Sequence, residues 1–443
     1  MYKLTNTSEK LNPYLKYILF IYLFTVFSGA FRKWFNLSKE IGNIILFLQL
    51  LVPFSLFLIR GGMKKWTIGV PLFIFLLFVL GLGVLNPLNL TVNHGVLGFL
   101  IHFSFFFLLF FYLNNRDKFN FGKIIDILVI IGFAQLILVF FQYTQPPDSF
   151  INRYADVEAV GSIAIVGNSA RVTGTFSYIS GFTGFLFFHS FLVWAMIKYR
   201  YKSVYTLILL SIGLVACFMS GARAATYLYL ILFGLILFVE YNSLSKVFFD
   251  FKLFIPTVLI ILVFLAVGSE KFTDLVQNAF TGFIERRNRG IDEGEENQRI
   301  IGDFIQLINF RGNYPVLGVG LGSTYQGANK LFGLSPYVIE YGFFESELTR
   351  IVLEGGFLLL FTRISVMIYL FRQLTIPVLG KITILLLILF FLPIVFNVYN
   401  AVFSALGIML VDNFYYYEKM NNIFSIRSRY NIKTGSPNKI NFL

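Results

Sequence analysis

Three arginines at the polar edges of apolar runs are the residues best suited to chemistry in this sequence. Arg171 precedes a Val-Thr-Gly-Thr-Phe segment, Arg223 ends the small-residue turn that starts at Ser220, and Arg299 begins an amphipathic run. A guanidinium group binds phosphate oxygens through two parallel hydrogen bonds and stays charged at any working pH. We therefore predict that these arginines clamp a departing phosphate or pyrophosphate and stabilise the charge that develops on it. For Arg299, an ion pair with a nearby acidic side chain is the alternative.

Two glutamates at the end of the same polar stretch are candidates for taking up a proton. Glu345 precedes the apolar run that starts at residue 347 and has no basic neighbour at helical spacing. A carboxylate there could accept the proton of an attacking sugar hydroxyl, and Glu347 is the second candidate. Because Glu347, Arg350 and Glu354 share one helix face, an internal ion pair is the alternative role for these three residues.

Three further side chains are candidates for binding a substrate. Arg32 lies at the edge of the first apolar run, Arg350 lies at the start of a later one, and Tyr325 lies in the polar stretch between runs. An aromatic ring beside polar groups can stack on a sugar ring. For Lys33, next to Arg32, we expect the amine to reach out to lipid headgroup phosphates.

The residue counts exclude several kinds of site. Cys217 is the only cysteine, so an intramolecular disulfide and thiolate metal sites are ruled out, and three histidines give a zinc site little support. We expect the histidines, including His102, to be packed residues. The acidic run 292–296 lacks the alternating ligand spacing of a calcium loop, so we predict a solvated turn and neither metal nor other cofactor. The spacing Gly318-x-Gly320-x-Gly322 predicts a tight backbone turn, since no strand and helix flank it as in a dinucleotide fold.

The composition indicates an all-α polytopic membrane protein. The chain is 57% hydrophobic and only 13% charged, with a mean hydropathy of +0.74, whereas a soluble domain is roughly half apolar and about a quarter charged. The net charge of +13 resides mostly in short loops, so we expect no binding of nucleic acid. About twelve apolar runs approach the length of a spanning helix. They are residues 16–31, 41–59, 66–85, 96–113, 124–143, 176–197, 203–220, 224–240, 253–268, 347–371, 382–398 and 399–414.

The basic residues predict how the chain is oriented. Lys and Arg follow every second span and the last one, which places both termini in the cytoplasm. The first apolar run lacks a cleavage site after it and is expected to be retained as a span. The predicted organisation is residues 1–268 with spans one to nine, 269–346 as one large extracytoplasmic loop with short amphipathic helices, 347–414 with spans ten to twelve, and 415–443 as a basic cytoplasmic tail.

The order of these motifs resembles the superfamily of O-antigen polymerases and O-antigen ligases, which are multi-pass membrane glycosyltransferases. The matching stretches are residues 171–176, the turn 220–223, residues 297–299 with the amphipathic run that leads to 315–320, and residues 345–348 running to 353–356. By motif, the resemblance covers residues 165–370.

The resemblance implies a helical, GT-C-like membrane fold with a cavity open to the outer leaflet of a bacterial cytoplasmic (inner) membrane. It implies glycans linked to undecaprenyl pyrophosphate as substrates, used without a metal or a nucleotide sugar. Arg223 and Arg299 then match pyrophosphate-contacting arginines, and Arg171 matches another recurrent arginine. Membrane lipid, a chain-length regulator and a flippase are the other partners that it implies.

One departure from the family pattern bears on the reaction. Ligases of this superfamily place a histidine about nine residues before the glutamate of a closing E-x-G motif, but Glu345 stands at that distance before Glu354. We therefore expect a polymerase that makes O-antigen, capsule or exopolysaccharide from lipid-linked repeat units. The alternatives are a ligase and a lipid-linked oligosaccharide flippase. The flippase is disfavoured because the spans carry few charges and no related halves are apparent.

Overall fold

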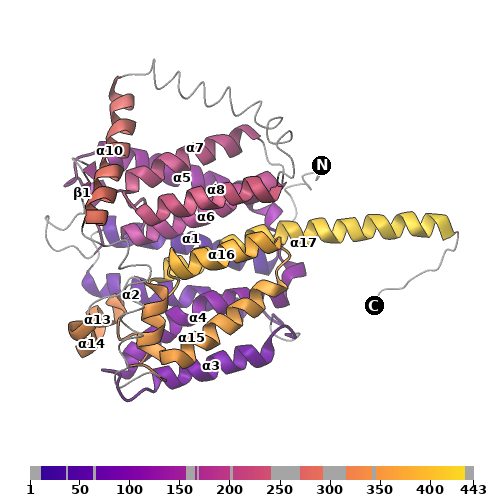
Figure 1. The fold of residues 1–443 in the computed structure, drawn as a ribbon, viewed down its shortest axis with the longest axis horizontal. Coiled ribbons are helices and arrows are strands. Elements are labelled where there is room, and N and C mark those ends of the chain that lie inside the picture. The colour runs from indigo at the N-terminus through magenta and orange to yellow at the C-terminus, as the bar shows by residue number, and fades with distance from the viewer. Residues whose placement is uncertain are drawn as a thin grey trace.

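The computed structural model describes residues 11–35, 38–62, 66–155, 165–166, 169–199, 203–240, 270–292, 316–341 and 346–434. Within this part of the chain the fold is helical, apart from a two-residue antiparallel pair of β1 (Ile165–Val166) and β2 (Ser169–Ala170). Most of the helices run alongside one another in a bundle (Figure 1). The prediction of an all-α fold is confirmed.

The helices of the bundle have clear bounds. The α-helices are α1 (Pro13–Trp34), α2 (Lys39–Leu51), α3 (Val70–Val84), α4 (Val92–Asn114), α5 (Ile125–Thr144), α6 (Ile179–Tyr199), α7 (Ser203–Ser220), α8 (Arg223–Glu240), α10 (Glu270–Asp292), α13 (Gln326–Phe332), α14 (Pro336–Tyr341), α15 (Glu347–Gln373), α16 (Val378–Phe390) and α17 (Val398–Thr434). The 3-10 turns are η1 (Val52–Leu58), η2 (Arg116–Lys118), η3 (Phe121–Lys123) and η4 (Phe150–Asn152). Short connections join α6 to α7, α7 to α8 and α15 to α16.

Seven of the described helices are long and apolar enough to cross a membrane, and Val70–Val84, Val204–Ser220 and Val378–Phe390 are shorter apolar helices. Each predicted span other than 253–268 coincides at least in part with a helix, and 253–268 lies outside the described residues. The last two predicted spans differ in detail. α16 ends at Phe390, and α17 continues to Thr434, well past the predicted end of the span at residue 414.

Large apolar side chains on the outside of the bundle suit a lipid surrounding. Phe78, Ile130, Ile137 and Phe361 are exposed by 61%, 66%, 64% and 65%. Soluble proteins rarely leave contiguous apolar surface of this kind uncovered. Together with the apolar helices, these side chains indicate a membrane protein.

Residues just before three helices explain where those helices begin. The side chains of Asn12, Thr91 and Ser346 each accept a hydrogen bond from a backbone N–H in the first turn of α1, α4 and α15, respectively. Such caps satisfy amide groups that have no partner within the helix. Pro13 adds to this in α1, because proline at the first helical position loses no hydrogen bond there.

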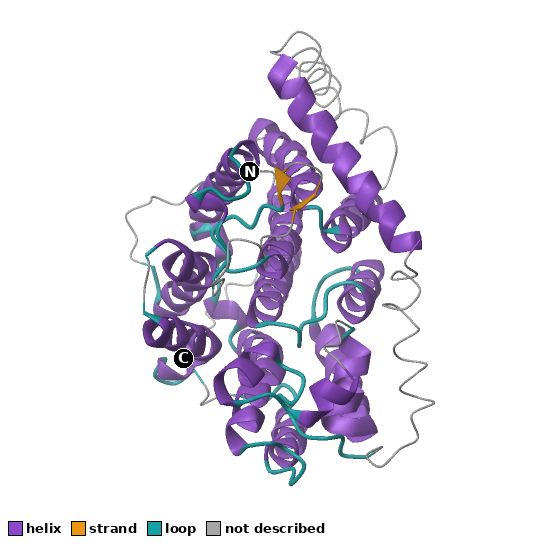
Figure 2. Ribbon diagram, turned by 90° about the vertical axis from the view of Figure 1, so that its left-hand side faces the viewer, coloured by secondary structure: helices purple, strands orange, loops and turns teal. Residues whose placement is uncertain are grey.

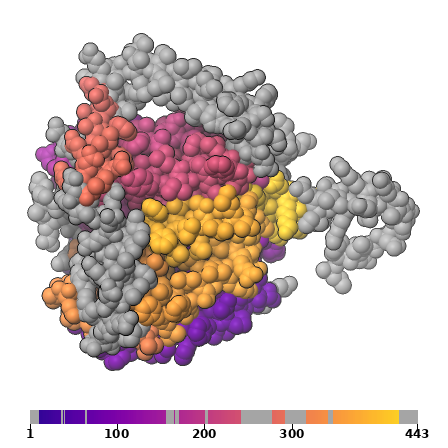
Figure 3. Space-filling model, in the orientation of Figure 1, coloured from indigo at the N-terminus to yellow at the C-terminus, as the bar shows by residue number. Residues whose placement is uncertain are grey.

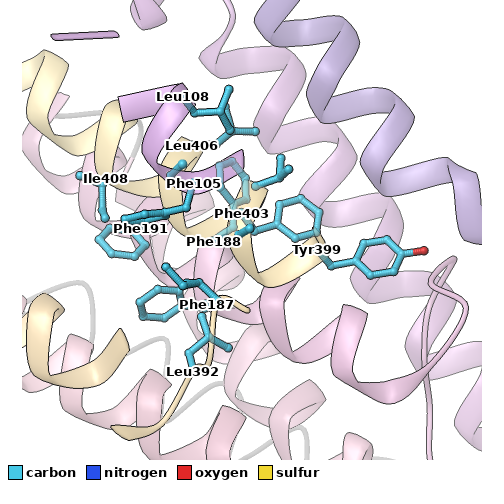
Figure 4. Packing of buried hydrophobic residues seen from close by; sticks show 14 of the residues in the cluster. Phe105, Leu108, Phe187, Phe188, Phe191, Leu392, Tyr399, Phe403, Leu406 and Ile408 are labelled. Atoms are coloured by element: carbon cyan, nitrogen blue, oxygen red, sulfur yellow. The ribbon is translucent and has the colours of Figure 1, made fainter. Parts of the chain in front are cut away.

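The centre of the bundle is formed by α4, α6 and α17. In the most apolar 18-residue stretches of α4 and α6, 89% of the residues are buried, whereas in that of the peripheral α2–η1 segment 28% are buried. The ring of Phe403 on α17 lies 5.7 Å from that of Phe188 and 5.8 Å from that of Phe185, both on α6 (Figure 4). At Gly407 a Cβ atom would come within 2.5 Å of the Phe191 ring, so α17 approaches α6 there as closely as glycine allows.

The two ends of the bundle form distinct faces. We call the end that carries Asn12, Asp117 and Tyr417 the tail face, because the last part of α17 leaves from it (Figure 1). There the Asn12 amide donates to the Lys118 carbonyl at 2.7 Å, and the Tyr417 hydroxyl donates to the Asp117 carbonyl at 3.1 Å. Asp412 on α17 forms an ion pair of 2.7 Å with Arg116 of η2, and it accepts a hydrogen bond of 2.8 Å from the Tyr112 hydroxyl on α4.

We call the opposite end, which carries Asn86, His94 and the segment 316–341, the loop face. Asn86 donates to the Gly318 carbonyl at 3.0 Å, and the His94 Nε2 lies 2.9 Å from the Gly333 carbonyl oxygen. Figure 2 views the bundle along most of its helix axes and shows loops gathered across this end. Along the chain, successive helices thus mostly run in opposite directions, from one face to the other.

The close approach of α17 and α6 gives a first prediction. Replacing Gly407 by valine should lower the free energy of unfolding by about 1–3 kcal/mol, because the added methyl groups would overlap the Phe191 ring. Gly234→Val on α8 is the matched control, since nothing lies within 4 Å of a Cβ atom at that position. Thermal melts of detergent-purified protein, followed by tryptophan fluorescence, measure the difference. Equal melting temperatures for the two variants would contradict this account of the core.

Candidate functional site

The glycine-rich segment 316–324 is inserted between α4 and α15 at the loop face. Gly318, Gly320 and Gly322 have φ angles of 63°, 101° and 76°, which confirms the predicted tight backbone turn. The space is as restrictive as the backbone, because a Cβ atom at Gly322 would lie 2.1 Å from the His94 carbonyl oxygen. Only glycine fits this path.

A break in α15 provides the partners for this segment. Gly356 has a φ of 63° and a ψ of −171°, which interrupts the helix. The carbonyl groups of Leu353 and Glu354 accept hydrogen bonds from Val319 N–H at 2.8 Å and Gly320 N–H at 3.0 Å. The loop backbone therefore replaces hydrogen bonds that an unbroken helix would make within itself.

The Glu354 carboxylate is the second anchor of the segment. It is 1% exposed and accepts hydrogen bonds from Gly322 N–H at 2.9 Å, from Thr324 N–H at 3.0 Å and from the Thr324 hydroxyl. His102 on α4 completes the set, with its Nε2 2.9 Å from the carboxylate. A buried carboxylate is stable only when its oxygens are satisfied in this way.

Arg363 fixes the orientation of His102. Its Nη1 lies 3.0 Å from His102 Nδ1 and donates to the His102 carbonyl at 2.9 Å. Since a guanidinium can only donate, Nδ1 is the acceptor and Nε2 carries the proton that is donated to Glu354. Arg363 also forms an ion pair of 2.9 Å with Glu347, whose other oxygen accepts from Val395 N–H at 2.9 Å. We call Glu347, Arg363, His102 and Glu354 the buried relay.

The sequence did not reveal two members of the buried relay. Glu347 pairs with Arg363 and Glu354 with His102, whereas Arg350, the expected partner of both glutamates, is 2% exposed and donates to the Val395 carbonyl at 3.3 Å. His102 is buried as expected, but it is a hydrogen-bonding partner and not only a packed ring. A charged or titratable residue inside an apolar run was the signal that could have identified Arg363 and His102.

A second group, which we call the loop-face cluster, consists of Arg32, Ser177, Tyr325, Arg350 and Tyr399. The Arg32 Nη1 donates to the Ser177 hydroxyl at 3.2 Å, and that hydroxyl lies 3.2 Å from the Tyr399 hydroxyl. Burial raises the pKa of Tyr325 to about 12, although the positive charges of Arg32 and Arg350 act to lower it. Three of the predicted substrate-binding residues, Arg32, Tyr325 and Arg350, are therefore close enough to interact electrostatically.

Lys33 corrects one expectation. It is 5% exposed and does not reach toward lipid headgroups. Its amine donates to the Thr173 hydroxyl at 2.7 Å and to the Gly174 carbonyl at 2.9 Å. The end of α1 thus holds the segment that follows Arg171, because hydrogen bonds to two oxygens offset the cost of burying the amine.

The structure brings Arg171 to the turn that precedes Arg223. The Arg171 guanidinium donates to the carbonyl of Ser220 at 3.1 Å and to that of Gly221 at 3.4 Å. Gly221 has a φ of 59°, and Arg223, 9% exposed, is the first residue of α8. We call Arg171, Ser220, Gly221 and Arg223 the arginine turn. The side chain of Arg171 therefore lies on the turn that leads directly into Arg223, at the loop face.

The remaining predicted site residues lie outside the described part of the chain. These are Arg299, Glu345 and most of the acidic run that follows Asp292. Among the described residues, no group of three or more His, Cys, Asp or Glu side chains could hold a metal ion. The arginine turn and the loop-face cluster are therefore the cationic groups from which a site can be built.

No family model, curated protein or solved structure matches this chain. Its function must be inferred from the contacts of its own residues.

The buried relay gives a second prediction. Glu354→Gln should lower the free energy of unfolding by about 3 kcal/mol, because an amide cannot accept all four hydrogen bonds and leaves His102 or the loop backbone unsatisfied. Thermal unfolding of the purified protein measures the loss. Glu285→Gln, an exposed glutamate on α10, is the control and should leave stability unchanged. If both variants melted together, the relay would not be what anchors the glycine-rich segment.

Proposed function

We propose that this chain is a polysaccharide polymerase of the cytoplasmic membrane of a bacterium. In this proposal it transfers a growing glycan from undecaprenyl pyrophosphate onto an incoming lipid-linked repeat unit. Both termini lie in the cytoplasm, as the basic loops predict, so the loop face is directed out of the cell. The chemistry requires neither a metal nor a nucleotide sugar, since the donor already carries its leaving group.

The observation that carries this proposal is the gathering of cationic and aromatic groups at the loop face. The loop-face cluster draws residues from α1, from the segment before α6, from the start of α13, and from α15 and α17. These segments are far apart in the sequence, yet Arg32, Ser177 and Tyr399 share one hydrogen-bonded network, and the charges of Arg32 and Arg350 act on Tyr325. A cationic group beside aromatic rings is suited to a glycan with a pyrophosphate end.

The reaction follows from this chemistry. A hydroxyl oxygen of the incoming unit attacks the anomeric carbon of the growing chain and forms the new glycosidic bond. The bond between that carbon and the pyrophosphate oxygen breaks, and the pyrophosphate keeps the electron pair. Arg171, Arg223 and Arg299 stabilise the resulting charge, because positioned cations are worth more at a developing charge than in water.

The proton of the attacking hydroxyl is assigned to Glu345. Both carboxylate oxygens of Glu347 accept hydrogen bonds, one from Arg363 and one from Val395 N–H, and the side chain is 1% exposed. A carboxylate held in this way positions its neighbours and is poorly placed to accept a proton from a substrate. Glu345, next to the start of α15, is the remaining candidate.

The polymerase is favoured over the ligase by the residue at position 345. A glutamate stands where ligases of the resembled superfamily have a histidine, so the acceptor hydroxyl would be activated by a carboxylate. The product would then be a longer lipid-linked glycan and not a glycan moved to another acceptor.

The third prediction tests this proposal. Arg223→Ala should reduce glycan extension by about 10²–10³-fold, which is the usual cost of removing one group that stabilises a developing charge. The assay incubates purified protein with lipid-linked saccharides extracted from the cells that carry it and resolves the products by length. Arg153→Ala is the control, because Arg153 is exposed and lies against the Phe150 ring.

Three outcomes separate the candidate functions. Longer lipid-linked glycans made by the wild type and the Arg153 variant, but not by the Arg223 variant, support the polymerase. Transfer to a second acceptor without lengthening would indicate a ligase. Movement of lipid-linked saccharide across vesicle membranes with no new bond would indicate a flippase.

A further inference from the structure

Helix α10 is oriented differently from the bundle. In Figure 1 it runs crosswise to the helices of the bundle, at the edge of the loop face. In the space-filling view its side chains stand along the edge of the molecule beside α7 and α8 (Figure 3). A helix of 23 residues in this direction lies parallel to the plane of the membrane that the bundle would cross.

The side chains of α10 divide into two faces. Phe280, Ile284 and Ile291 are exposed by 49%, 37% and 49%, and their spacings of four and seven residues place them on one stripe. Glu285 and Arg289 are also exposed and lie on the other side of the helix. The charged side is stable in contact with water, whereas exposure of the apolar stripe to water is unfavourable.

Aromatic contacts pack α10 against the loop-face end of α7. The rings of Phe280 and Phe283 lie 5.5 Å and 5.2 Å from the ring of Phe218 on α7, both edge-on. Phe218 is two residues before Ser220, whose carbonyl accepts from Arg171. The helix is therefore packed directly beside the arginine turn.

We propose that α10 is an interfacial helix, and that its stripe of Phe280, Ile284 and Ile291 inserts into the phospholipid leaflet on the loop-face side. A helix parallel to the membrane, with one apolar side and basic residues near it, binds at the boundary between headgroups and acyl chains. Arg287 is exposed, and because it follows Ile284 by three residues and precedes Ile291 by four, it lies on the same side of the helix as the stripe. Its apolar stem can lie along the leaflet while its guanidinium extends to the headgroup phosphates. The covering is thus lipid, whose phosphates match the charge of Arg287.

This placement has a consequence that rests on the proposed function. Because α10 packs against Phe218, the depth of α10 in the membrane also fixes the depth of the arginine turn. Both then lie at the level of the lipid phosphates. A polyprenyl carrier keeps its pyrophosphate in that same layer. The leaving group therefore meets Arg171 and Arg223 without moving out of the headgroup region.

Site-directed spin labelling of the full chain tests the depth of α10. Cys217, the only cysteine, is replaced by serine, and single cysteines are introduced as Ile284→Cys, Ile291→Cys, Glu285→Cys and Arg289→Cys. Each labelled protein is reconstituted into vesicles of phosphatidylethanolamine and phosphatidylglycerol. The ratio of collision rates with oxygen and with a water-soluble nickel chelate reports depth. We expect this ratio to be several-fold higher at positions 284 and 291 than at 285 and 289.

Two results would overturn the proposal. Equal ratios on both sides of the helix would mean that α10 lies in water. Low accessibility of positions 284 and 291 to both reagents would mean that protein, such as a second copy of this chain, covers the stripe. The measurement uses no glycan, so it can fail or succeed independently of the extension assay: a helix found at the interface in a protein without polymerase activity would refute the function alone.

Discussion

The arrangement of the loop face depends on the hydrogen bonds made to one buried carboxylate, that of Glu354. Its two oxygens accept from a histidine on α4 and from the backbone and side chain of the glycine-rich segment, so one group joins three parts of the chain. Buried charges are expensive unless they are paired and hydrogen-bonded. That cost makes the arrangement specific, because moving the loop by even one residue would leave the carboxylate without its donors. Tyr325 directly follows the anchored segment and is thereby held within electrostatic range of Arg32 and Arg350.

A similar logic governs the arginine turn and the end of α1. Arg171 and Lys33 both donate hydrogen bonds to carbonyl or hydroxyl oxygens of neighbouring segments. Glu347 and Glu354 are by contrast committed to Arg363 and His102 deeper in the bundle. The Glu347–Arg363 and Glu354–His102 pairs thus lie inside the bundle, whereas Arg171 lies at the loop face.

Much of this architecture follows from the sequence, and the exceptions have physical causes. Apolar runs predict the helices because length and hydropathy suffice for a span, and Gly318 to Gly322 predict a turn because their spacing suits no helix. The Arg171 and Arg223 motifs were expected to act together, and the structure places them at one turn. The pairing of Glu347 with Arg363 was missed because sixteen residues separate them, beyond the spacing of adjacent turns, and the break at Gly356 changes the direction of α15. The length of α10 was missed because its composition is mixed and its apolar stripe is short.

The distances along the sequence between partners in the buried relay have a consequence for the synthesis and insertion of the protein. If the helices insert into a bilayer during synthesis, Glu347 and Arg363 enter it on the same helix, and each then neutralises the other. His102 is synthesised 252 residues before Glu354 and, on the same assumption, enters the bilayer without its acceptor. A histidine can do so as the uncharged imidazole, whereas a lysine or arginine at the same position would carry a full charge into lipid while the ribosome completed the remaining spans. The choice of histidine therefore suits the order of translation as well as the finished fold.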